Sequence, residues 1–365
     1  MKRWAQKAAG FCSAVLAVVA VACVAGRLPA IAAQNTAMAA AGFIMPGGAA
    51  EAIKSDYWEE EEEDNSQPGA VSSAAPSQAS SGAPQGQSTP GSGAASASVS
   101  STGPGTTNSA VTLPGKIQEI AIANTGTQYN NIWVKNYNKS HGLDIAAELA
   151  KQPAVKIKKN STPQVLIYHT HTTEAFFGDD NRTQDLSRSV VAVGDQIAAQ
   201  LQSGGINTVH DLTVHDYPMY NGSYDRSKVT IQNNLKKYPG LQVTLDIHRD
   251  AMGTSDGTRI KPTVTVNGKK AAQVMIISGC DDDGTLGFPN WEYNLRLALR
   301  IQKSLSDSYP GLARPLKFSP NKYNENLTKG SLLIEIGTEV NTLDEVKYAG
   351  ELVGKALVAT LNQLS

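Results

Sequence analysis

The sequence is poor in cysteine, with three in 365 residues. Cys12 and Cys23 lie in an apolar N-terminal stretch and Cys280 stands alone in the remainder, so a disulfide framework is excluded. An excess of basic residues is also lacking, because 32 Lys and Arg stand against 33 Asp and Glu. This balance excludes a basic binding surface as the main theme, and we expect no nucleic-acid partner.

The motifs of several enzyme classes are missing as well. No Gly-x-Ser-x-Gly turn is present to support a serine hydrolase, and no glycine-rich phosphate loop accompanies His248-Arg249-Asp250, which matches a kinase catalytic loop in three letters only. Cys280 has no histidine beside it, and Asp281-Asp282-Asp283 departs from the spacing of an EF-hand calcium loop. The chemistry must therefore come from another set of residues.

The N-terminus has the features of an export or anchor segment. Lys2, Arg3 and Lys7 precede an uncharged apolar run over 11–26, and the apolar character continues after Arg27. A basic flank before such a run stays in the cytoplasm while the remainder crosses the membrane. Residues 1–33 are therefore predicted to be a cytoplasmic flank with a membrane anchor; the Ala-Ile-Ala triplet at 30–32 leaves cleavage as a signal peptide open.

Two segments separate this anchor from the folded part. Residues 34–64 end in six consecutive acidic residues, 59–64, which repel one another and predict a solvated acidic spacer. Residues 65–112 carry no charge and consist mostly of Ser, Ala, Gly, Pro, Gln, Thr and Asn. Such a composition buries too little apolar area to offset chain entropy, so we expect a disordered linker. A long tether suggests a folded part that works at a distance from the bilayer.

Residues 113–365 are predicted to form one folded domain of the α/β class. Apolar runs typical of buried strands alternate with helical patterns that end at glycine or proline, as at Gly204-Gly205 and Pro239-Gly240. Strands are expected over 165–168, 241–247, 274–278 and 331–336, and helices over 186–202, 223–238, 291–305 and 343–364. This alternation predicts a mostly parallel sheet flanked by helices on both faces.

Candidate ligands follow the ends of these strands. The first strand continues into His169-Thr-His171-Thr-Thr-Glu174, and the second ends in Asp246-Ile-His248-Arg249. Since the carboxyl ends of strands in an open sheet border the ligand crevice, these side chains are expected to meet there. Two imidazoles and a carboxylate suit catalytic zinc and leave a position for water, which predicts His171, Glu174 and His248 as ligands. Mn or Co would fit the same set.

Other residues are assigned around this set, with alternatives left open. Glu335 lies within an apolar strand, where a carboxylate needs a partner or a task, and it is the candidate for proton transfer. Asp246 is two residues from His248 on the same strand face and is placed to hold its second ring nitrogen. His169 is an alternative ligand or a hydrogen-bond donor beside the metal. His210 and His215 are expected to be structural or rim residues, although they could also bind the metal. Arg226 and Arg249 are expected either to contact a substrate carboxylate or an oxyanion, or to form structural salt bridges.

Four motifs together resemble the stage II sporulation protein P family. They are Val165-Leu-Ile-Tyr-His-Thr-His-Thr-Thr-Glu174, Tyr224-Asp-Arg-Ser227, Asp246-Ile-His-Arg-Asp-Ala251 and Leu333-Ile-Glu-Ile-Gly337. The resemblance covers residues from about 116 to the end and the plan of an anchor followed by a tether. It implies the fold of zinc-dependent N-acetylmuramoyl-L-alanine amidases, more distantly that of zinc carboxypeptidases. His171, Glu174 and His248 match the metal ligands of those enzymes, and Glu335 matches their catalytic glutamate.

The resemblance also implies an activity, a place and partners. The expected activity is zinc-dependent amidase cleavage of peptidoglycan between N-acetylmuramic acid and L-alanine, with endopeptidase cleavage of peptide cross-links. The expected place is the septum during engulfment of the forespore, alongside the sporulation proteins D and M, with a single-pass membrane anchor and an extracytoplasmic catalytic domain. Two alternatives stay open, a non-catalytic wall-binding scaffold and a zinc carboxypeptidase of stem peptides.

Overall fold

The computed structural model describes residues 115–160 and 162–365. The expected anchor, the acidic spacer and the whole of the expected linker lie outside these residues. Among the described residues, no helix combines the length and the apolar character that a membrane crossing needs.

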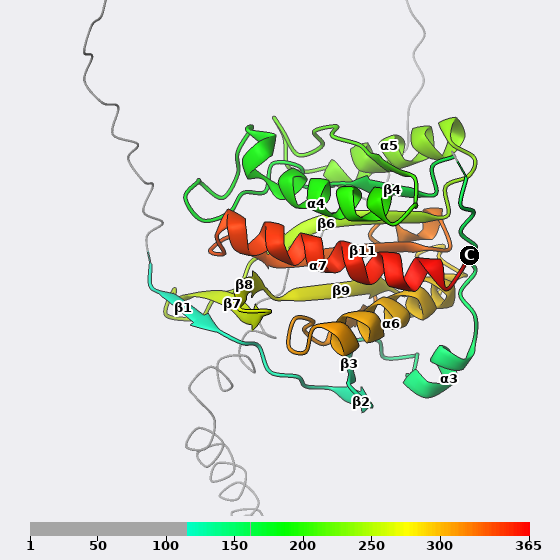
Figure 1. Ribbon diagram of the computed structural model, residues 1–365, viewed down its shortest axis with the longest axis horizontal. Helices are drawn as coiled ribbons and strands as arrows, with labels where there is room; N and C mark the ends of the chain where they lie inside the picture. Colours follow the sequence, from blue (N-terminus) through cyan, green and yellow to red (C-terminus); the bar gives the residue numbers. More distant parts are fainter. Residues whose placement is uncertain (1–114, 161) are drawn as a thin grey trace, which may run out of the picture. The chain divides into compact units, whose positions relative to one another are not determined.

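The domain is built from strands and helices that alternate along the chain (Figure 1). The strands are β1 (Ile117–Ile120), β2 (Thr127–Tyr129), β3 (Ile132–Asn136), β4 (Val165–Tyr168), β5 (Thr208–His210), β6 (Val243–Asp250), β7 (Arg259–Val266), β8 (Lys269–Ala272), β9 (Val274–Gly279), β10 (Leu316–Ser319) and β11 (Ser331–Thr338). The α-helices are α3 (Ile145–Ala150), α4 (Val190–Ser203), α5 (Ser223–Lys237), α6 (Trp291–Ser308) and α7 (Leu343–Asn362). Two short 3-10 helices are η1 (Leu186–Arg188) and η2 (Glu325–Leu327). All four predicted strands and four predicted helices are present, with ends shifted by a few residues.

Local sequence explains where the main helices begin and end. The Ser189 side chain accepts a hydrogen bond from the Val191 amide and caps α4, which ends at Gly204. Helix α7 begins with a capping box in which Thr342 and Glu345 each satisfy the other's backbone amide. These caps satisfy amides that a helix start leaves without intrahelical partners.

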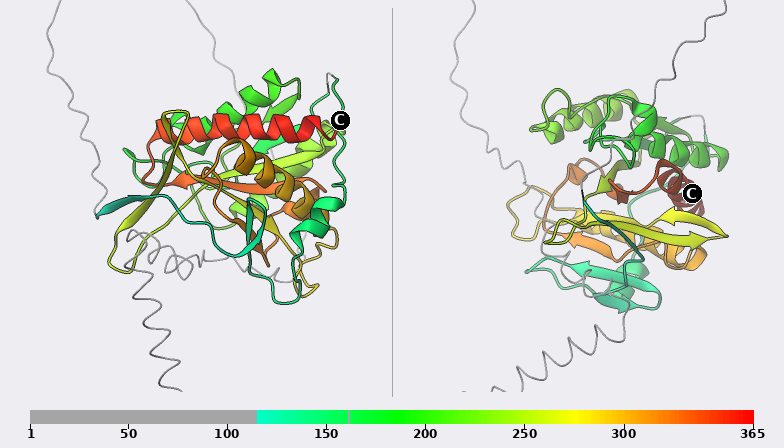
Figure 2. Two further views of the ribbon diagram at one scale, coloured as in Figure 1. Left: turned by 60° about the horizontal axis from the view of Figure 1, so that its bottom comes forward. Right: turned by 90° about the vertical axis from the view of Figure 1, so that its left-hand side faces the viewer.

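The main sheet has eight strands in the order β2-β3-β10-β9-β11-β6-β4-β5. Strands β11, β6, β4 and β5 are mutually parallel, and so are β3, β10 and β9, but β11 pairs antiparallel with β9 and β2 with β3. The expectation of a mostly parallel sheet was therefore wrong, and the sheet is mixed. The reason is the β7–β8 hairpin between β6 and β9, which reverses the chain so that β9 runs against β6. This hairpin and β1 form a separate three-stranded sheet, which faces the viewer in the right panel of Figure 2.

Helices cover both faces of the main sheet, as predicted. Helices α4, α7 and α6 lie side by side over one face (Figure 1), where Val165, Ile167, Leu245 and Ile334 join the largest buried apolar cluster. The alternate residues of the strands point to the other face. There Leu166 and Tyr168 pack with Ile231 of α5.

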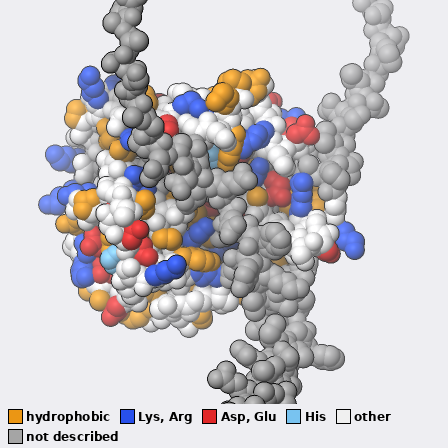
Figure 3. Space-filling view, turned by 180° about the vertical axis from the view of Figure 1, so that it is seen from behind, with side chains coloured by type: hydrophobic (Ala, Val, Ile, Leu, Met, Phe, Trp, Pro, Cys, Tyr) orange, Lys and Arg blue, Asp and Glu red, His pale blue; other side chains and the backbone are white. Residues whose placement is uncertain are grey.

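Polar residues share this second face with the smaller apolar clusters. The alternation along β6 and β11 directs Asp246, His248 and Glu335 away from the α4–α6–α7 layer, because their neighbours belong to its core. The space-filling view from behind shows Lys and Arg side chains as well as Asp and Glu side chains among the described residues, without a patch of one sign (Figure 3). This mixture agrees with the balanced charge of the sequence.

Candidate metal centre

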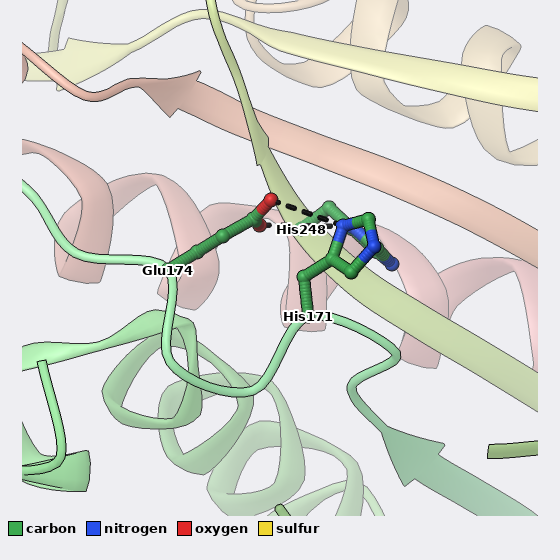
Figure 4. A group of neighbouring side chains, drawn as sticks. All are labelled: His171, Glu174 and His248. Atoms are coloured by element: carbon green, nitrogen blue, oxygen red, sulfur yellow. Dashed lines mark ion pairs between the residues drawn. The ribbon is translucent and has the colours of Figure 1, made fainter. Parts of the chain in front are cut away.

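His171, Glu174 and His248 converge on one point, and one ligand atom from each lies within 4.8 Å of the others. His171 and Glu174 belong to the loop that follows β4, whereas His248 lies near the end of β6 (Figure 4). His171 Nδ1 is 3.3 Å from Glu174 Oε1, and His248 Nδ1 is 3.6 Å from Glu174 Oε2. All three side chains are buried. This donor set, two imidazoles and one carboxylate facing one another, fits Zn²⁺.

The loop that carries two of these donors is fixed by backbone and side-chain contacts. The Glu174 amide donates to the His171 carbonyl at 3.1 Å, which closes a turn and brings both side chains to the same side. The Thr170 amide donates to Asp246 Oδ1 at 2.8 Å, and the Thr170 hydroxyl donates to Oδ2 at 2.6 Å. The Arg249 amide donates to Glu174 Oε2 at 3.1 Å. The loop is therefore attached to β6 at two places.

Asp246 also contacts the imidazole of His248. Its Oδ1 lies 2.9 Å from His248 Nε2, on the side of the ring away from Glu174, although the contact lacks the direction of a full hydrogen bond. One ring nitrogen thus faces Glu174 and the other faces Asp246. A carboxylate in this place orients an imidazole for metal binding through the opposite nitrogen.

The electrostatics of the cluster favour a bound cation. Burial lowers the pKa of His248, but the carboxylates of Asp246, Glu174 and Glu335 outweigh burial and raise it to about 10. Burial raises the pKa of Glu174, and the hydrogen bond from His171 together with the charges of His248 and Arg249 lower it to about 2. Three buried carboxylates around two imidazoles make a site in which a divalent ion compensates negative charge.

Glu335 lies directly across the β6–β11 pair from His248. The two residues are register partners in adjacent parallel strands, and the Glu335 side chain is buried. A bulge follows at once, because the register shifts between Glu335 and Thr338. Gly337 adopts φ 69° there, and an added Cβ would lie 2.8 Å from Asn341 Oδ1. The strand thus ends its regular pairing at the carboxylate, on the same face as the metal donors.

The other candidate histidines are engaged elsewhere. His169 Nδ1 is 2.8 Å from the Ile247 carbonyl, and its Nε2 is 2.8 Å from His210 Nε2. His210 Nδ1 in turn lies 3.0 Å from Asp195 of α4. Burial and the nearby His210 lower the pKa of His169 to about 3. His169 is thus not brought to the cluster as an alternative ligand, because its ring points toward α4.

His215 is held in the same manner. Its Nδ1 lies 2.7 Å from the His169 carbonyl, and its Nε2 lies 2.8 Å from Thr230 Oγ1 on α5. Both ring nitrogens therefore have protein partners, and His215 joins the loop before α5 to the loop after β4.

The two arginines expected to meet substrate bind backbone carbonyls instead. Arg226 donates to the carbonyls of Met219 at 2.6 Å and Asn221 at 3.1 Å, and its Nε contacts the His215 carbonyl. Arg249, almost fully buried, donates to two carbonyls of the loop after β4 at 3.0 Å, those of residues 175 and 181. Their guanidinium groups hold loops in this structure, and the expected substrate or oxyanion contact stays a prediction. The open alternative, a structural salt bridge, is also not what holds them.

Sequence reasoning missed the residues that border His171. Tyr220 lies against the His171 ring, with centroids 4.5 Å apart, and Tyr224 meets it edge-on at 5.7 Å. Arg182 lies over the Tyr220 ring, 4.2 Å from its centroid, and donates to Asp216 at 2.5 Å. Tyr224 belongs to one of the four motifs, but no local pattern marks Arg182, Asp216 or Tyr220, because only the fold brings them beside the loop after β4.

The fold and the site together define an α/β domain with a buried His-Glu-His cluster and a neighbouring glutamate. A sequence profile of stage II sporulation protein P (SpoIIP) matches residues 51–358. The chain belongs to this family.

A relative from Bacillus subtilis agrees with that membership. The chain is 30% identical over 271 residues to stage II sporulation protein P of Bacillus subtilis (strain 168), and the match covers 65% of each chain. The chain thus spans about two thirds of the length of that relative. Among solved structures, it is similar to N-acetylmuramoyl-L-alanine amidase AmiC2 of Nostoc punctiforme (12% identity, TM-score 0.33, 57% of this chain and 97% of that one). It is also similar to the catalytic domain of CwlV, N-acetylmuramoyl-L-alanine amidase from Bacillus (Paenibacillus) polymyxa var. colistinus (13% identity, TM-score 0.34, 55% of this chain and 98% of that one).

Proposed function

We propose that the chain is a zinc-dependent peptidoglycan hydrolase of sporulation, an N-acetylmuramoyl-L-alanine amidase with endopeptidase activity on peptide cross-links. The observation that carries the proposal is the buried cluster of His171, Glu174 and His248 with Glu335 beside it on the next strand. A scaffold protein has no need to bury this many charged groups in one place, since each costs free energy unless it is paired. Membership of the SpoIIP family supports the substrate class.

His171, Glu174 and His248 would hold the metal. Zn²⁺ supplies Lewis acidity that polarises the scissile carbonyl and activates water. Glu335 takes a proton from the attacking water and passes it to the nitrogen of L-alanine as the amide bond breaks. The products are a free carboxylate on the sugar side and a free amine on the peptide. Asp246 and the turn of the loop after β4 keep the donors oriented throughout.

The proposal extends to the N-terminal part of the chain. The apolar run after the basic flank supports a single-pass anchor over residues 1–33, and the uncharged segment 65–112 supports a tether that lets the domain reach the septal wall. Family membership supports action during engulfment together with the sporulation proteins D and M.

Activity is tested with the full-length, zinc-loaded chain and purified peptidoglycan, followed by mass spectrometry of the soluble products. Amidase action releases peptides with a free N-terminal L-alanine, endopeptidase action separates cross-linked peptides, and a carboxypeptidase releases single terminal residues. We expect the first two sets of products, and their loss on chelation. The absence of all three sets, in the presence of the sporulation protein D as well, would show that the chain is a scaffold.

Two variants test the assigned residues. Glu335→Gln is expected to abolish turnover while zinc content stays at the wild-type value, because Glu335 is assigned to proton transfer; Glu351→Gln, on the exposed side of α7, is the control. His171→Ala is expected to remove one donor and lower the zinc content, whereas His141→Ala, whose ring packs on Trp291, should retain it. Normal rates for Glu335→Gln, or normal zinc content for His171→Ala, would reject the respective role.

A further inference from the structure

An arginine lies beside the metal donors with only part of its guanidinium in use. Arg182 is placed opposite Glu174 by a backbone bridge between the two residues, and the Thr183 amide donates to the Thr173 carbonyl at 2.8 Å. Its side chain is 39% exposed, and it reaches Asp216, whose side chain is fully buried. The Arg182 position is therefore fixed at both ends, through its backbone and through its guanidinium.

Asp216 needs only one nitrogen of this guanidinium. Arg182 Nη1 donates to Asp216 Oδ2 at 2.5 Å, and the same carboxylate accepts from the Thr173 amide at 3.1 Å and the Thr173 hydroxyl at 2.7 Å. Among the described residues, Nε and Nη2 of Arg182 have no hydrogen-bond partner. An arginine donates five N–H bonds in a planar fork, so most of this fork is open to a planar acceptor from solution.

The open part of the fork borders the metal cluster. Arg182 lies over the Tyr220 ring, and the same ring contacts His171, whose Nδ1 is 3.3 Å from Glu174 Oε1. The guanidinium and a candidate metal ligand thus contact one and the same aromatic ring.

From this geometry we propose that Arg182 binds the free α-carboxylate of the second residue of the stem peptide. Arg182 thereby selects substrates in which this carboxylate is not amidated. The inference rests on the proposed function. Because Arg182 and His171 contact the same Tyr220 ring, the guanidinium is close enough for a group one residue beyond the L-alanine whose nitrogen is released, whereas carboxylates at the end of the peptide lie farther along the chain. Asp216 and Tyr220 position the guanidinium, and Arg182 makes the contact.

The experiment compares two soluble muramyl peptides that differ only at this position, one with a free α-carboxyl and one with a carboxamide. With the zinc-loaded full-length chain, we expect kcat/KM to be roughly 10- to 100-fold higher for the free acid, the size of a charge-assisted hydrogen bond. Arg182→Gln should cleave both peptides at similar rates, mainly through a higher KM for the acid. Arg188→Gln, which removes another exposed arginine paired with Asp179 near the same loop, should keep the wild-type preference.

The outcomes separate a substrate contact from a structural ion pair. If Arg182 only fastens the loop, Arg182→Gln will lower the rates for both peptides by one factor and keep their ratio, which overturns the proposal. A wild-type ratio near one overturns it as well, without any variant. Should Arg182→Gln not fold, Arg182→Lys keeps a charge beside Asp216 and is expected to reduce the ratio, since an ammonium group lacks the planar fork.

A binding measurement keeps this inference separate from the amidase proposal. The affinity of the chelator-treated chain for the released peptide is measured by calorimetry, with the free acid and with the carboxamide. We expect tighter binding of the acid, by the same factor as in the rates, and equal binding by Arg182→Gln. If neither muramyl peptide is cleaved but this preference is seen, the amidase proposal fails and the carboxylate site stands; equal affinities in the wild-type chain reject the carboxylate site.

Discussion

Asp246→Asn tests whether one carboxylate organises the metal centre. Asp246 accepts from the Thr170 amide at 2.8 Å and the Thr170 hydroxyl at 2.6 Å, and it lies 2.9 Å from His248 Nε2. Asparagine keeps the shape and one acceptor, but it loses the negative charge beside the ring and turns the second oxygen into a donor. The loop after β4 and the His248 ring are then both less well oriented.

The size of the effect follows from these contacts. Loss of a carboxylate that orients a metal-binding imidazole costs about 10- to 100-fold in metal affinity. In Asp246→Asn, the new side-chain NH2 group faces a hydrogen-bond donor at a place where the carboxylate oxygen accepted a hydrogen bond. The free energy of unfolding of the metal-free protein is therefore expected to fall by about 1–3 kcal/mol. Burial of Asp246 makes solvent rescue of the lost hydrogen bond inefficient.

Zinc affinity is measured by competition with a chelator of known affinity, and unfolding by urea titration of the metal-free chain. Asp195→Asn is the matched control, because Asp195 also pairs with a histidine, His210 at 3.0 Å, but lies outside the cluster with a side chain that is 60% exposed. We expect this control to bind zinc like the wild type. Zinc affinities of Asp246→Asn and Asp195→Asn within twofold of each other would refute the role given to Asp246.

Two further predictions concern buried groups outside the metal donors. Burial raises the pKa of Glu325 well above its ordinary value, so the folded chain keeps a proton that the unfolded chain loses. The contribution of Glu325 to stability is therefore complete below the unfolded pKa of about 4.3 and is lost as the pH rises toward the folded pKa. In urea titrations from pH 4 to 8, the free energy of unfolding of Glu325→Gln should rise relative to that of the wild type as the pH rises. A difference that stays constant with pH would contradict this. Gly194→Ala would place a Cβ 2.6 Å from His210 Nε2 and 2.9 Å from His169 Nε2. This crowding should lower the melting temperature, although alanine has the better helix propensity. The control Gly142→Ala meets no atom within 4 Å and should leave the melting temperature unchanged.

Much of the core could be predicted because its strands are buried on both faces. Val165–Tyr168 and Ser331–Thr338 are continuous buried runs, and such runs stand out in a sequence. Strand β7 was missed because buried and half-exposed residues mix along Arg259–Val266, a pattern without a clear period. That omission also caused the error about the sheet, since strand direction depends on how many reversals the chain makes between two strands.

The candidate site divides in the same way. The meeting of His171, Glu174 and His248 could be predicted because each follows or ends a recognisable strand, and neighbouring parallel strands bring such ends together. The surroundings could not be found, because hydrogen bonds to carbonyls leave no trace in the sequence. Arg226 and Arg249 looked like ligands for anions, and only coordinates show that their guanidinium groups are occupied by the backbone.

The hydrogen bonds from Arg226 to backbone carbonyls have a consequence for ligand binding. Arg226 donates hydrogen bonds to backbone carbonyls on both sides of the Tyr217-Pro218 peptide, which holds residues 215–221 in one conformation without a ligand. A preorganised loop loses little conformational entropy when a ligand binds beside it, so binding there should not require a slow loop rearrangement. Under the proposed function, a preformed loop beside His171 would exclude a stem peptide with a bulky branch near the cleaved bond.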